Sequence, residues 1–412
     1  MERSEAVTEV VLGVSGGIAA YKACELLRLF TESGHRVRVV PTASALKFVG
    51  APTWAALSGQ PVSTEVWDAV HEVPHVRLGQ RADLVVVAPA TADVLAKAAT
   101  GQADDLLTNT LLTARCPVMY VPAMHTEMWE HPATVENVAT LRRRGAVVIE
   151  PAVGRLTGVD TGKGRLPDPA EIFAMARRVL ARPDQQPDLV GRHVVVTAGG
   201  TREPIDPVRF IGNRSSGKQG YAFARAAVAR GARVTIVSAN VALPAPAGAD
   251  IVRVGTTEEL RQATLKAAEE ADAVVMAAAP CDFRPEHYEA EKIKKRDGAD
   301  APTLRLVANP DIAAELGARK RPGQVLVAFA AETAAEPVAL ENAREKLLRK
   351  RADLIVVNEV GVDRTFGADT NAAIVLGPEI EPIRIGERSK EELADAVLDL
   401  VSGRLCHTPG AG

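Results

Sequence analysis

Short apolar, β-branched runs alternate along the chain with longer segments in which apolar residues recur at helical spacing. Such runs are typical of buried strands in a parallel sheet, and the segments between them are typical of crossover helices. The first half predicts strands at 10–16, 37–42, 83–90, 118–123 and 146–151. The second half predicts strands at 193–200, 232–239, 271–279, 324–332 and 352–360. The pattern therefore predicts an α/β protein with two Rossmann-like, doubly wound parallel sheets.

A polar stretch separates the two halves. The segment ARPDQQPDLVGR, residues 181–192, is rich in Pro, Asp and Gln, as interdomain linkers often are. With 412 residues the chain is also too long for one ordinary domain. We therefore predict a first domain at 1–182, a linker at 183–190 and a second domain at 191–412.

Charge and composition exclude several classes of protein. A net charge of −3 argues against a nucleic-acid-binding protein, which usually carries a basic face. The start, MERSEAVTEV, lacks the apolar core of a signal peptide, and no apolar run approaches the roughly 18 residues of a membrane span. The four cysteines are scattered, with no C-x-x-C pair and no zinc spacing. We expect a cytoplasmic protein.

The stretch GNRSSGKQG at 212–220 has the G-x-x-x-x-G-K spacing of a Walker A phosphate loop. Its context does not fit, because Gln219 stands where a Ser or Thr would bind Mg²⁺ and the segment TREPIDPVR separates it from the preceding apolar run. A Gly/Ser-rich stretch at the start of a helix can nevertheless present backbone N–H groups to a phosphate. It predicts a phosphate-bearing ligand rather than a P-loop ATPase.

A second motif lies in the first apolar run, where Gly13 to Gly17 match the G-x-S-x-G nucleophile elbow. In α/β-hydrolases that elbow follows several strands and an oxyanion-hole loop, whereas here nothing precedes it. The same turn lets backbone amides at a helix N-terminus approach an anion. On this stretch alone, a tight turn without a ligand is the alternative.

Three further stretches make the anion-binding interpretation stronger. Residues 73–107 carry His75 before the strand that ends in APATAD, residues 122–129 read PAMHTEMW, and residues 156–169 form a Gly-rich loop before a helix. Such strand ends are where doubly wound sheets bind ligands. Together these stretches resemble the homo-oligomeric flavin-containing cysteine decarboxylases, specifically phosphopantothenoylcysteine decarboxylase, over residues 8–180.

This resemblance implies an FMN site and a catalytic histidine, His75. Decarboxylation of an α-amido carboxylate needs an electron sink, and oxidation of the neighbouring CH₂–SH group on the flavin supplies it. By the resemblance, the residues that hold or border FMN would be Ser15, Gly17, Ile18, Thr42, Ser44, Pro89, Thr91 and Ala92.

Two positions depart from the family pattern. His125 stands where the family has the Asn of Pro-Ala-Met-Asn, and Thr157 or a neighbour stands where the flap has a cysteine acid. A Thr hydroxyl is too weak an acid for that proton transfer, whereas imidazole titrates near neutral pH. We therefore hypothesise that His125 takes over part of the proton transfer. The alternatives are that this half releases the unsaturated enethiol or no longer turns over.

The second half carries a different resemblance. The segment TAGGTREPIDPVRFIGNRSSGKQGYAFA at 197–224 resembles phosphopantothenate–cysteine ligase, which follows the decarboxylase in many bacterial chains. The family activates its carboxylate with CTP as an acyl-cytidylate, and cysteine then displaces CMP. The negative charge of that reaction requires Lys, Arg and Mg²⁺.

The resemblance also assigns ligase residues. Asn213 would hold the acyl-cytidylate beside Arg209, and Lys292 of EKIKK would act in cysteine condensation. Pro280 and Cys281 replace the usual Val-Ala before Asp282, and Pro removes one N–H donor from the segment that borders the nucleotide. The remaining nucleotide and substrate residues would be Ser215, Ser216, Gly217, Gly220, Asp282, Asn309, Asp311, Phe329, Lys346 and Lys350.

Taken together, the motifs predict a bifunctional enzyme of coenzyme A synthesis. It would join 4′-phosphopantothenate to L-cysteine with CTP and decarboxylate the product on FMN, as a homo-oligomer. One alternative keeps an active ligase behind a front half that is inactive or stops at the enethiol. Another is a regulatory protein on a flavoprotein scaffold. A nicotinamide reductase does not fit, because neither half has G-x-G-x-x-G with a downstream acidic residue.

Overall fold

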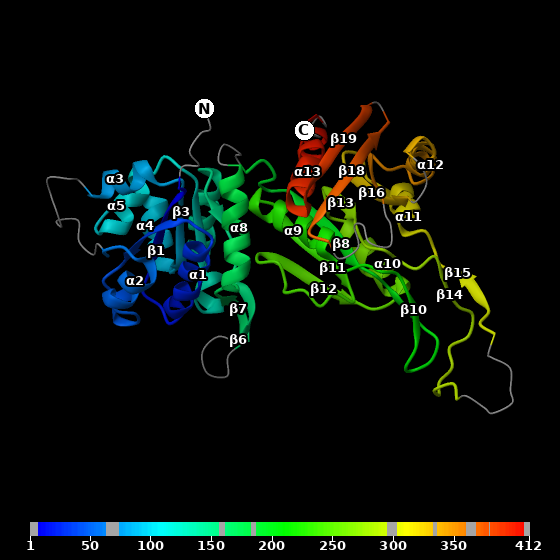
Figure 1. The fold of residues 1–412 in the computed structure, drawn as a ribbon, viewed down its shortest axis with the longest axis horizontal. Helices are drawn as coiled ribbons and strands as arrows, with labels where there is room; N and C mark the ends of the chain where they lie inside the picture. The colour runs from blue at the N-terminus through cyan, green and yellow to red at the C-terminus, as the bar shows by residue number, and fades with distance from the viewer. Residues whose placement is uncertain are drawn as a thin grey trace. The chain divides into compact units, whose positions relative to one another are not determined.

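The computed structural model divides the chain into two compact units, which we describe separately (Figure 1). The first unit comprises residues 1–190 with 228–231, and the second comprises residues 191–227 with 232–412. The structure describes residues 7–62, 74–155, 161–182, 187–294, 303–332, 336–359, 368–378 and 380–407.

The first unit is built on a five-stranded parallel sheet with the order β2-β1-β3-β4-β5. This is the flavodoxin-like order, in which the direction of winding reverses between β1 and β3 and leaves a ligand-binding crevice at their carboxyl ends. The sheet strands are β1 Glu9–Val14, β2 Arg36–Pro41, β3 Leu84–Ala90, β4 Val118–Pro122 and β5 Val147–Val148.

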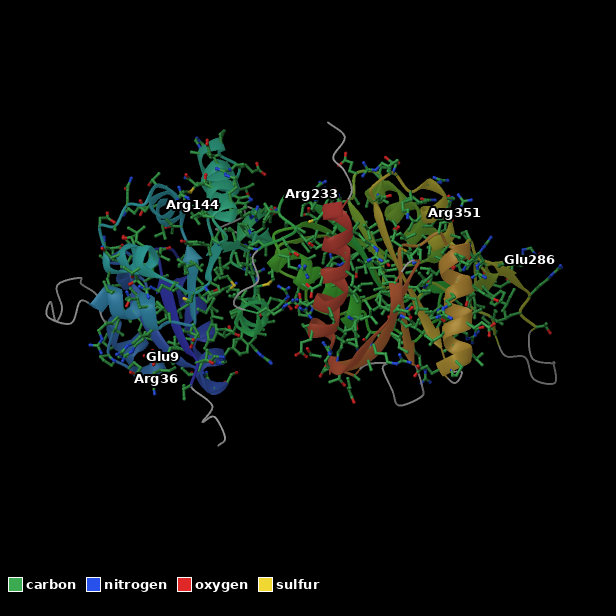
Figure 2. All side chains as sticks on the ribbon, turned by 90° about the horizontal axis from the view of Figure 1, so that it is seen from above. Glu9, Arg36, Arg144, Arg233, Glu286 and Arg351 are labelled. Atoms are coloured by element: carbon green, nitrogen blue, oxygen red, sulfur yellow. The ribbon has the colours of Figure 1, made fainter. Side chains whose placement is uncertain are left out.

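Helices complete this unit and bury the apolar strands. Helix α1 packs against α8, and α4 packs against α5 and α7. At the amino edge of the sheet, Glu9 and Arg36 form an ion pair of 2.9 Å and lie side by side in Figure 2. The helices are α1 Ala20–Glu32, η1 Ala45–Lys47, α2 Ala51–Ser58, α3 Pro74–Arg81, α4 Ala92–Thr100, α5 Leu106–Thr113, α6 Thr126–Trp129, α7 Pro132–Arg143 and α8 Pro169–Ala181.

The second unit contains an eight-stranded sheet with the order β12-β11-β8-β13-β16-β17-β18-β19. Its first six strands are parallel and follow the Rossmann order, so its switch point lies between β8 and β13. The strands are β8 His193–Gly199, β11 Arg233–Ala239, β12 Ala249–Val254, β13 Ala273–Met276, β16 Val325–Glu332, β17 Leu354–Glu359, β18 Thr370–Gly377 and β19 Ile380–Ser389.

The helices of this unit alternate with the strands, as the hydrophobic pattern predicts. Capping residues define several of their starts: Thr256 and Glu259 form a capping box at α10, and the Asp311 side chain accepts from the Ala314 N–H at α11. The helices are α9 Lys218–Ala229, α10 Thr257–Ala268, α11 Ile312–Arg319, α12 Glu336–Arg349 and α13 Lys390–His407.

The predicted α/β class is confirmed, with one addition. Strands β18 and β19 pair antiparallel, so the second sheet is not parallel throughout. The turn between them is too short for the crossover that a parallel pair requires. Three small antiparallel pairs lie beside the main sheets, and in Figure 1 the β14–β15 pair extends away from the body of the second unit. Their strands are β6 Ala152–Arg155, β7 Thr161–Arg165, β9 Arg202–Pro204, β10 Phe210–Gly212, β14 Phe283–Pro285 and β15 Leu306–Ala308.

None of the described helices combines the length and the apolar character that a bilayer crossing requires.

Candidate functional site

In the first unit, Ser15 ties together the two strand ends that border the switch point. Its N–H and its hydroxyl both donate to the Pro89 carbonyl, at 3.2 and 2.7 Å, and its hydroxyl accepts from the Thr91 N–H at 2.9 Å. Ser15 is 1% exposed. The predicted FMN residue Ser15 is thus a buried link between the loops after β1 and β3.

The glycines after Ser15 have different surroundings. A Cβ added to Gly16 would lie 2.3 Å from the Ser44 Cβ, so only glycine lets the loops after β1 and β2 come this close. A Cβ on Gly17 would meet only the Thr91 Cγ2, at 3.9 Å. The turn before α1 therefore packs closely against the loop after β2 at Gly16 and has free space at Gly17. A phosphate bound at a helix N-terminus requires such space beside the backbone.

The remaining predicted flavin residues lie around the same strand ends. The Thr42 hydroxyl accepts from the Ala45 N–H at 3.2 Å, and the Thr91 hydroxyl caps α4, whose first residue is Ala92. Ile18 is 68% exposed. The structure thus brings the predicted FMN residues of three strand ends to one edge of the sheet, and backbone amides there fit a flavin phosphate.

Two residues predicted to take part in catalysis cannot be placed on this edge. His75 belongs to α3, but its side chain lies outside the described residues, and so does Thr157. The hairpin β6–β7, whose strands end at Arg155 and begin again at Thr161, brackets the segment that contains Thr157.

This hairpin packs against the loop that carries His125. The Met124 N–H donates to the Gly164 carbonyl at 3.0 Å, and a Cβ on Gly162 would lie 2.2 Å from the Thr126 Oγ1. The Thr126 hydroxyl is buried and has no hydrogen-bond partner among the described residues. His125 itself is exposed, immediately before α6. The loop that carries His125 therefore contacts β7, the second strand of this hairpin.

The second unit contains a pocket of about 420 Å³ at its switch point. One wall is the loop before α9, where Gly217 has a φ of +79°. A Cβ on Gly220 would lie 2.8 Å from the Thr197 carbonyl oxygen, so α9 starts in close contact with β8. This is the arrangement in which backbone N–H groups bind phosphate.

The pocket gathers most of the predicted ligase residues from distant parts of the chain. Arg209 and Lys292 do not line it. The predicted residues that line it are Asn213, Ser215, Ser216, Gly217, Gly220, Asp282, Asn309, Asp311, Phe329, Lys346 and Lys350.

Three basic residues, Lys346, Arg349 and Lys350, line the same pocket as the loop before α9. Lys350 donates to both carboxylate oxygens of Asp311, at 2.6 and 2.7 Å. Lys346 and Arg349 belong to the last turn of α12, and Lys350 directly follows this helix. Burial on its own would raise the pKa of Asp311, but the Lys350 ammonium and the Ala314 N–H lower it below its ordinary value. Asp311 therefore orients Lys350 while it remains ionised.

Two asparagines hold the segment with the unusual Pro280 and Cys281. Asn213 Nδ2 donates to the Pro280 carbonyl at 2.9 Å, and Asn309 Nδ2 donates to the Cys281 carbonyl at 2.9 Å. The Cys281 N–H donates to the Thr201 hydroxyl at 2.8 Å. Neither residue 280 nor residue 281 therefore offers a backbone donor to a ligand, since Pro has none and that of Cys281 is used internally.

A buried carboxylate connects Arg209 to the basic segment that contains Lys292. Asp206, 2% exposed, accepts from Arg209 Nη1 at 2.9 Å and from the Ile293 N–H at 3.2 Å. Arg209 Nη1 also donates to the Ile293 carbonyl at 3.1 Å. The same carboxylate accepts the N–H groups of Val208 and Arg209. Asp206 thus fixes the residue next to Lys292 to the loop between β9 and β10.

Sequence analysis missed part of the pocket lining: Lys218, Gln219, Asn358, Asn371 and Lys390. Lys218 and Gln219 were visible in the Walker-like stretch but carried no assigned role. Asn358 ends an apolar run, where a polar residue in a parallel strand is a signal of a site. Asn371 and Lys390 belong to the antiparallel part of the sheet and the helix after it, which the pattern did not connect with the pocket.

Among the described residues, no group of three or more His, Cys, Asp and Glu side chains forms a metal site.

Comparison with known proteins follows the division into two units. Residues 1–180 match the Flavoprotein family, and residues 189–405 match the DNA/pantothenate metabolism flavoprotein C-terminal domain. The coenzyme A biosynthesis bifunctional protein CoaBC of Mycobacterium tuberculosis (strain H37Rv) is 57% identical over 402 residues, which is 95% of this chain and 96% of the relative. CoaBC of Bacillus subtilis is 45% identical over 371 residues, 89% of each chain. A crystal structure of the C-terminal domain of CoaBC is 33% identical, with a TM-score of 0.46, and covers 53% of this chain and 98% of that domain.

The two sites and these matches define a class of protein: a flavoprotein domain followed by a domain of pantothenate metabolism, in one enzyme. The chain belongs to the CoaBC family of bifunctional coenzyme A biosynthesis proteins. It is a decarboxylase and a ligase, as the two resemblances in the sequence predict, and the flavin cofactor is confirmed by the first domain's family.

Proposed function

We propose that the ligase half joins 4′-phosphopantothenate to L-cysteine with CTP. The pantothenate carboxylate attacks the α-phosphate of CTP and releases pyrophosphate, and the cysteine amine then attacks the acyl carbon and releases CMP. The observation that carries this proposal is that the loop before α9, Lys346 and Lys350 all line one pocket. Backbone N–H groups and ammonium groups in one pocket suit a triphosphate whose charge shifts during the reaction.

Each predicted residue has a role in this scheme. Ser215, Ser216 and Gly217 would bind the triphosphate with backbone N–H groups, and Phe329 would contact the base or the ribose. Lys292, held near Arg209 through Asp206, would act on the acyl-cytidylate when cysteine attacks. Mg²⁺ would enter with the nucleotide and neutralise its phosphates.

We further propose that the front half decarboxylates 4′-phosphopantothenoylcysteine to 4′-phosphopantetheine, with FMN at the β1–β3 switch point. Bound FMN would supply the oxidation that creates an electron sink and the hydride that is returned afterwards. The residues at the three strand ends, Ser15, Gly17, Thr42, Ser44 and Thr91, would bind or border it. His75 would be the catalytic histidine, as the resemblance implies.

His125 would donate the proton that the family takes from its flap cysteine. Only two cysteines occur in the first unit, Cys24 and Cys116. Cys116 precedes β4 and so lies at the amino edge of the sheet, away from the carboxyl ends of the strands where the predicted flavin residues gather. Burial raises the pKa of its thiol to about 11. Neither its place nor its acidity suits the reaction, whereas His125 stands in the loop against which the flap hairpin packs.

Domain limits and assembly belong to the same proposal. We place the decarboxylase at residues 1–182, the linker at 183–190 and the ligase at 191–412, in a cytoplasmic homo-oligomer. Size-exclusion chromatography with light scattering measures the stoichiometry.

Mass spectrometry of the reaction products tests the proposed function. The full-length, flavin-loaded protein is incubated with phosphopantothenate, cysteine, CTP and Mg²⁺. A product lighter than the ligated intermediate by one CO₂ is the expected result. Failure to form the ligated intermediate with CTP, while another nucleoside triphosphate supports it, would overturn the choice of nucleotide.

A second candidate function concerns the front half alone. The absence of a cysteine between Cys116 and Cys281 favours a reaction that stops at the enethiol. In that case the same experiment yields a product that has lost CO₂ and two further hydrogens. Repeating the reaction with His125→Asn separates the alternatives, because this variant converts a complete decarboxylase into an enethiol producer and leaves an enethiol producer unchanged.

A further inference from the structure

Two buried amide oxygens line the ligase pocket without a partner. Asn358 lies in β17 and Asn371 in β18, and these residues are 9% and 4% exposed. Within the described part of the chain, neither Oδ1 atom has a hydrogen-bond partner, and both residues line the pocket. An unpaired buried acceptor is unfavourable unless a ligand supplies the missing hydrogen.

A chain of hydrogen bonds determines which way the Asn371 amide points. Gln219 Nε2 donates to the Lys390 carbonyl at 3.1 Å, and a carbonyl can only accept. The Gln219 Oε1 must therefore point the other way, where it accepts from Asn371 Nδ2 at 3.3 Å. Because one N–H of the Asn371 Nδ2 is committed to Gln219, the orientation of the amide is fixed, and its Oδ1 is the buried acceptor that is left without a partner among the described residues.

The charges around this oxygen restrict what it can bind. A phosphate oxygen would be repelled, because both groups are acceptors. Lys218 and Lys390 also line the pocket, and their two ammonium groups disfavour a divalent cation, although Asp369 pairs with Lys218 at 2.7 Å. Burial and the neighbouring Lys218 lower the pKa of Lys390, which agrees with two ammonium groups close together. A neutral O–H donor avoids both conflicts.

We propose that Asn371, together with Asn358, accepts hydrogen bonds from the ribose hydroxyls of the nucleotide. This inference rests on the proposed function, since it assumes that a nucleoside triphosphate lies on the loop before α9. The pocket volume of about 420 Å³ falls within the range of small-molecule sites. Gln219, which takes the place of the metal-binding hydroxyl of a Walker A motif, serves here as a positioning residue: it orients Asn371.

Nucleotide binding to the full-length protein tests this inference. Calorimetry measures the affinities of CTP, 2′-deoxy-CTP and 3′-deoxy-CTP for wild type, Asn371→Ala and Asn358→Ala. We expect wild type to bind at least one deoxy analogue about five- to tenfold more weakly than CTP, the loss of one hydrogen bond. In the variant that removes the matching acceptor, the ratio of affinities should fall to about one.

Two further variants separate a specific contact from a damaged pocket. Gln219→Ala leaves Asn371 in place but removes the hydrogen bond that orients it. The ratio of CTP affinity to deoxy-analogue affinity should therefore also decrease in this variant, which provides the test if Asn371→Ala is unfolded. Thr370→Ala is the matched control on β18, because the Thr370 hydroxyl points to Glu387 at 3.1 Å and does not line the pocket. It should keep the wild-type ratio.

The outcomes distinguish this inference from the proposed function. The ribose contact is wrong if wild type binds CTP and both deoxy analogues equally well. It is also wrong if Asn371→Ala and Asn358→Ala keep the wild-type ratio of CTP affinity to deoxy-analogue affinity. In both cases the ligase proposal stands. If Asn371→Ala instead shifts the Mg²⁺ dependence at an unchanged ratio, the oxygen is a metal ligand and the inference is wrong. If no nucleotide binds to wild type, both proposals fail.

Discussion

At the residue scale, single polar side chains hold both sites together through hydrogen bonds that the sequence motifs do not show. Ser15 looks like a phosphate-binding residue because it stands in a Gly-rich turn after a strand. In the structure its hydroxyl joins Pro89 to Thr91. Motifs could locate Ser15, Asn213 and the loop before α9 from local sequence. They could not reveal which atoms pair, because the partners come from strands far along the chain.

Replacing Ser15 by Ala should therefore weaken both the fold and the flavin site. The change leaves the Thr91 N–H and the Pro89 carbonyl without the hydroxyl that joins them, which costs about 1–3 kcal/mol for a buried hydrogen-bonding group. Denaturant unfolding measures the stability, and flavin fluorescence after dialysis measures cofactor retention. The exposed Ser33→Ala is the control. Equal stability of wild type and Ser15→Ala would show that the link is not significant.

The Asp311–Lys350 pair predicts a pH dependence. Because the pKa of Asp311 is lowered in the folded state, the pair's contribution is fully present above the unfolded pKa of about 4. It is lost as the pH falls through the lower folded pKa. Asp311→Asn should thus have a lower Tm than wild type at neutral pH, and the difference should shrink in acid. A difference in Tm that is constant from neutral to acidic pH would contradict this coupling.

At the element scale, the chain's buried strands were predictable and its antiparallel edge was not. Continuous runs such as HVVVTAGG have no polar face, so they indicate strands covered on both sides. Strand β18 alternates exposed and buried residues, and its apolar signal is weaker for that reason. The polar residues Asn371 of β18 and Lys390 at the start of α13 were not assigned to the pocket, because the pattern does not show that the antiparallel edge brings them there.

The loop between β9 and β10 should act as the anchor of the basic segment. Asp206→Asn keeps the shape of the side chain but removes the charge that Arg209 and the Ile293 N–H share. We expect trypsin to cleave the full-length variant faster at Lys292 and Lys294 than it cleaves wild type. Amide formation should fall by on the order of ten- to a hundredfold, while pyrophosphate release continues without cysteine.

Glu289→Gln is the matched control for the anchor. Glu289 belongs to the same segment, and its contact with the described residues is made by its backbone N–H, which donates to the Ile205 carbonyl at 3.0 Å. Its cleavage and its rate of amide formation should equal those of wild type. Unchanged proteolysis in Asp206→Asn would show that the segment is held by other contacts, whatever happens to the activity.

At the scale of the whole molecule, two chemically separate sites work in sequence on one chain. The ligase product is the decarboxylase substrate, so a block in either half leaves a different compound. If Lys292 acts on the acyl-cytidylate as proposed, Lys292→Ala should reduce amide formation by on the order of a hundredfold, the loss of one charged group that stabilises the transition state. Decarboxylation of supplied 4′-phosphopantothenoylcysteine should proceed at the wild-type rate. The exposed Lys266→Ala is the control, and slow decarboxylation in Lys292→Ala would contradict independent sites.

His125→Asn is the reverse experiment. It restores the residue that the flavoprotein decarboxylases carry, and if His125 donates the missing proton, enethiol should accumulate while the ligated intermediate forms normally. The loss in full turnover should lie between about a hundredfold and ten thousandfold, the usual range for a general acid. Rapid-quench mass spectrometry distinguishes the enethiol from the reduced product. A variant that reduces the enethiol as fast as wild type would assign the proton to another group, and the hairpin β6–β7, which packs against this loop, is where it would have to be sought.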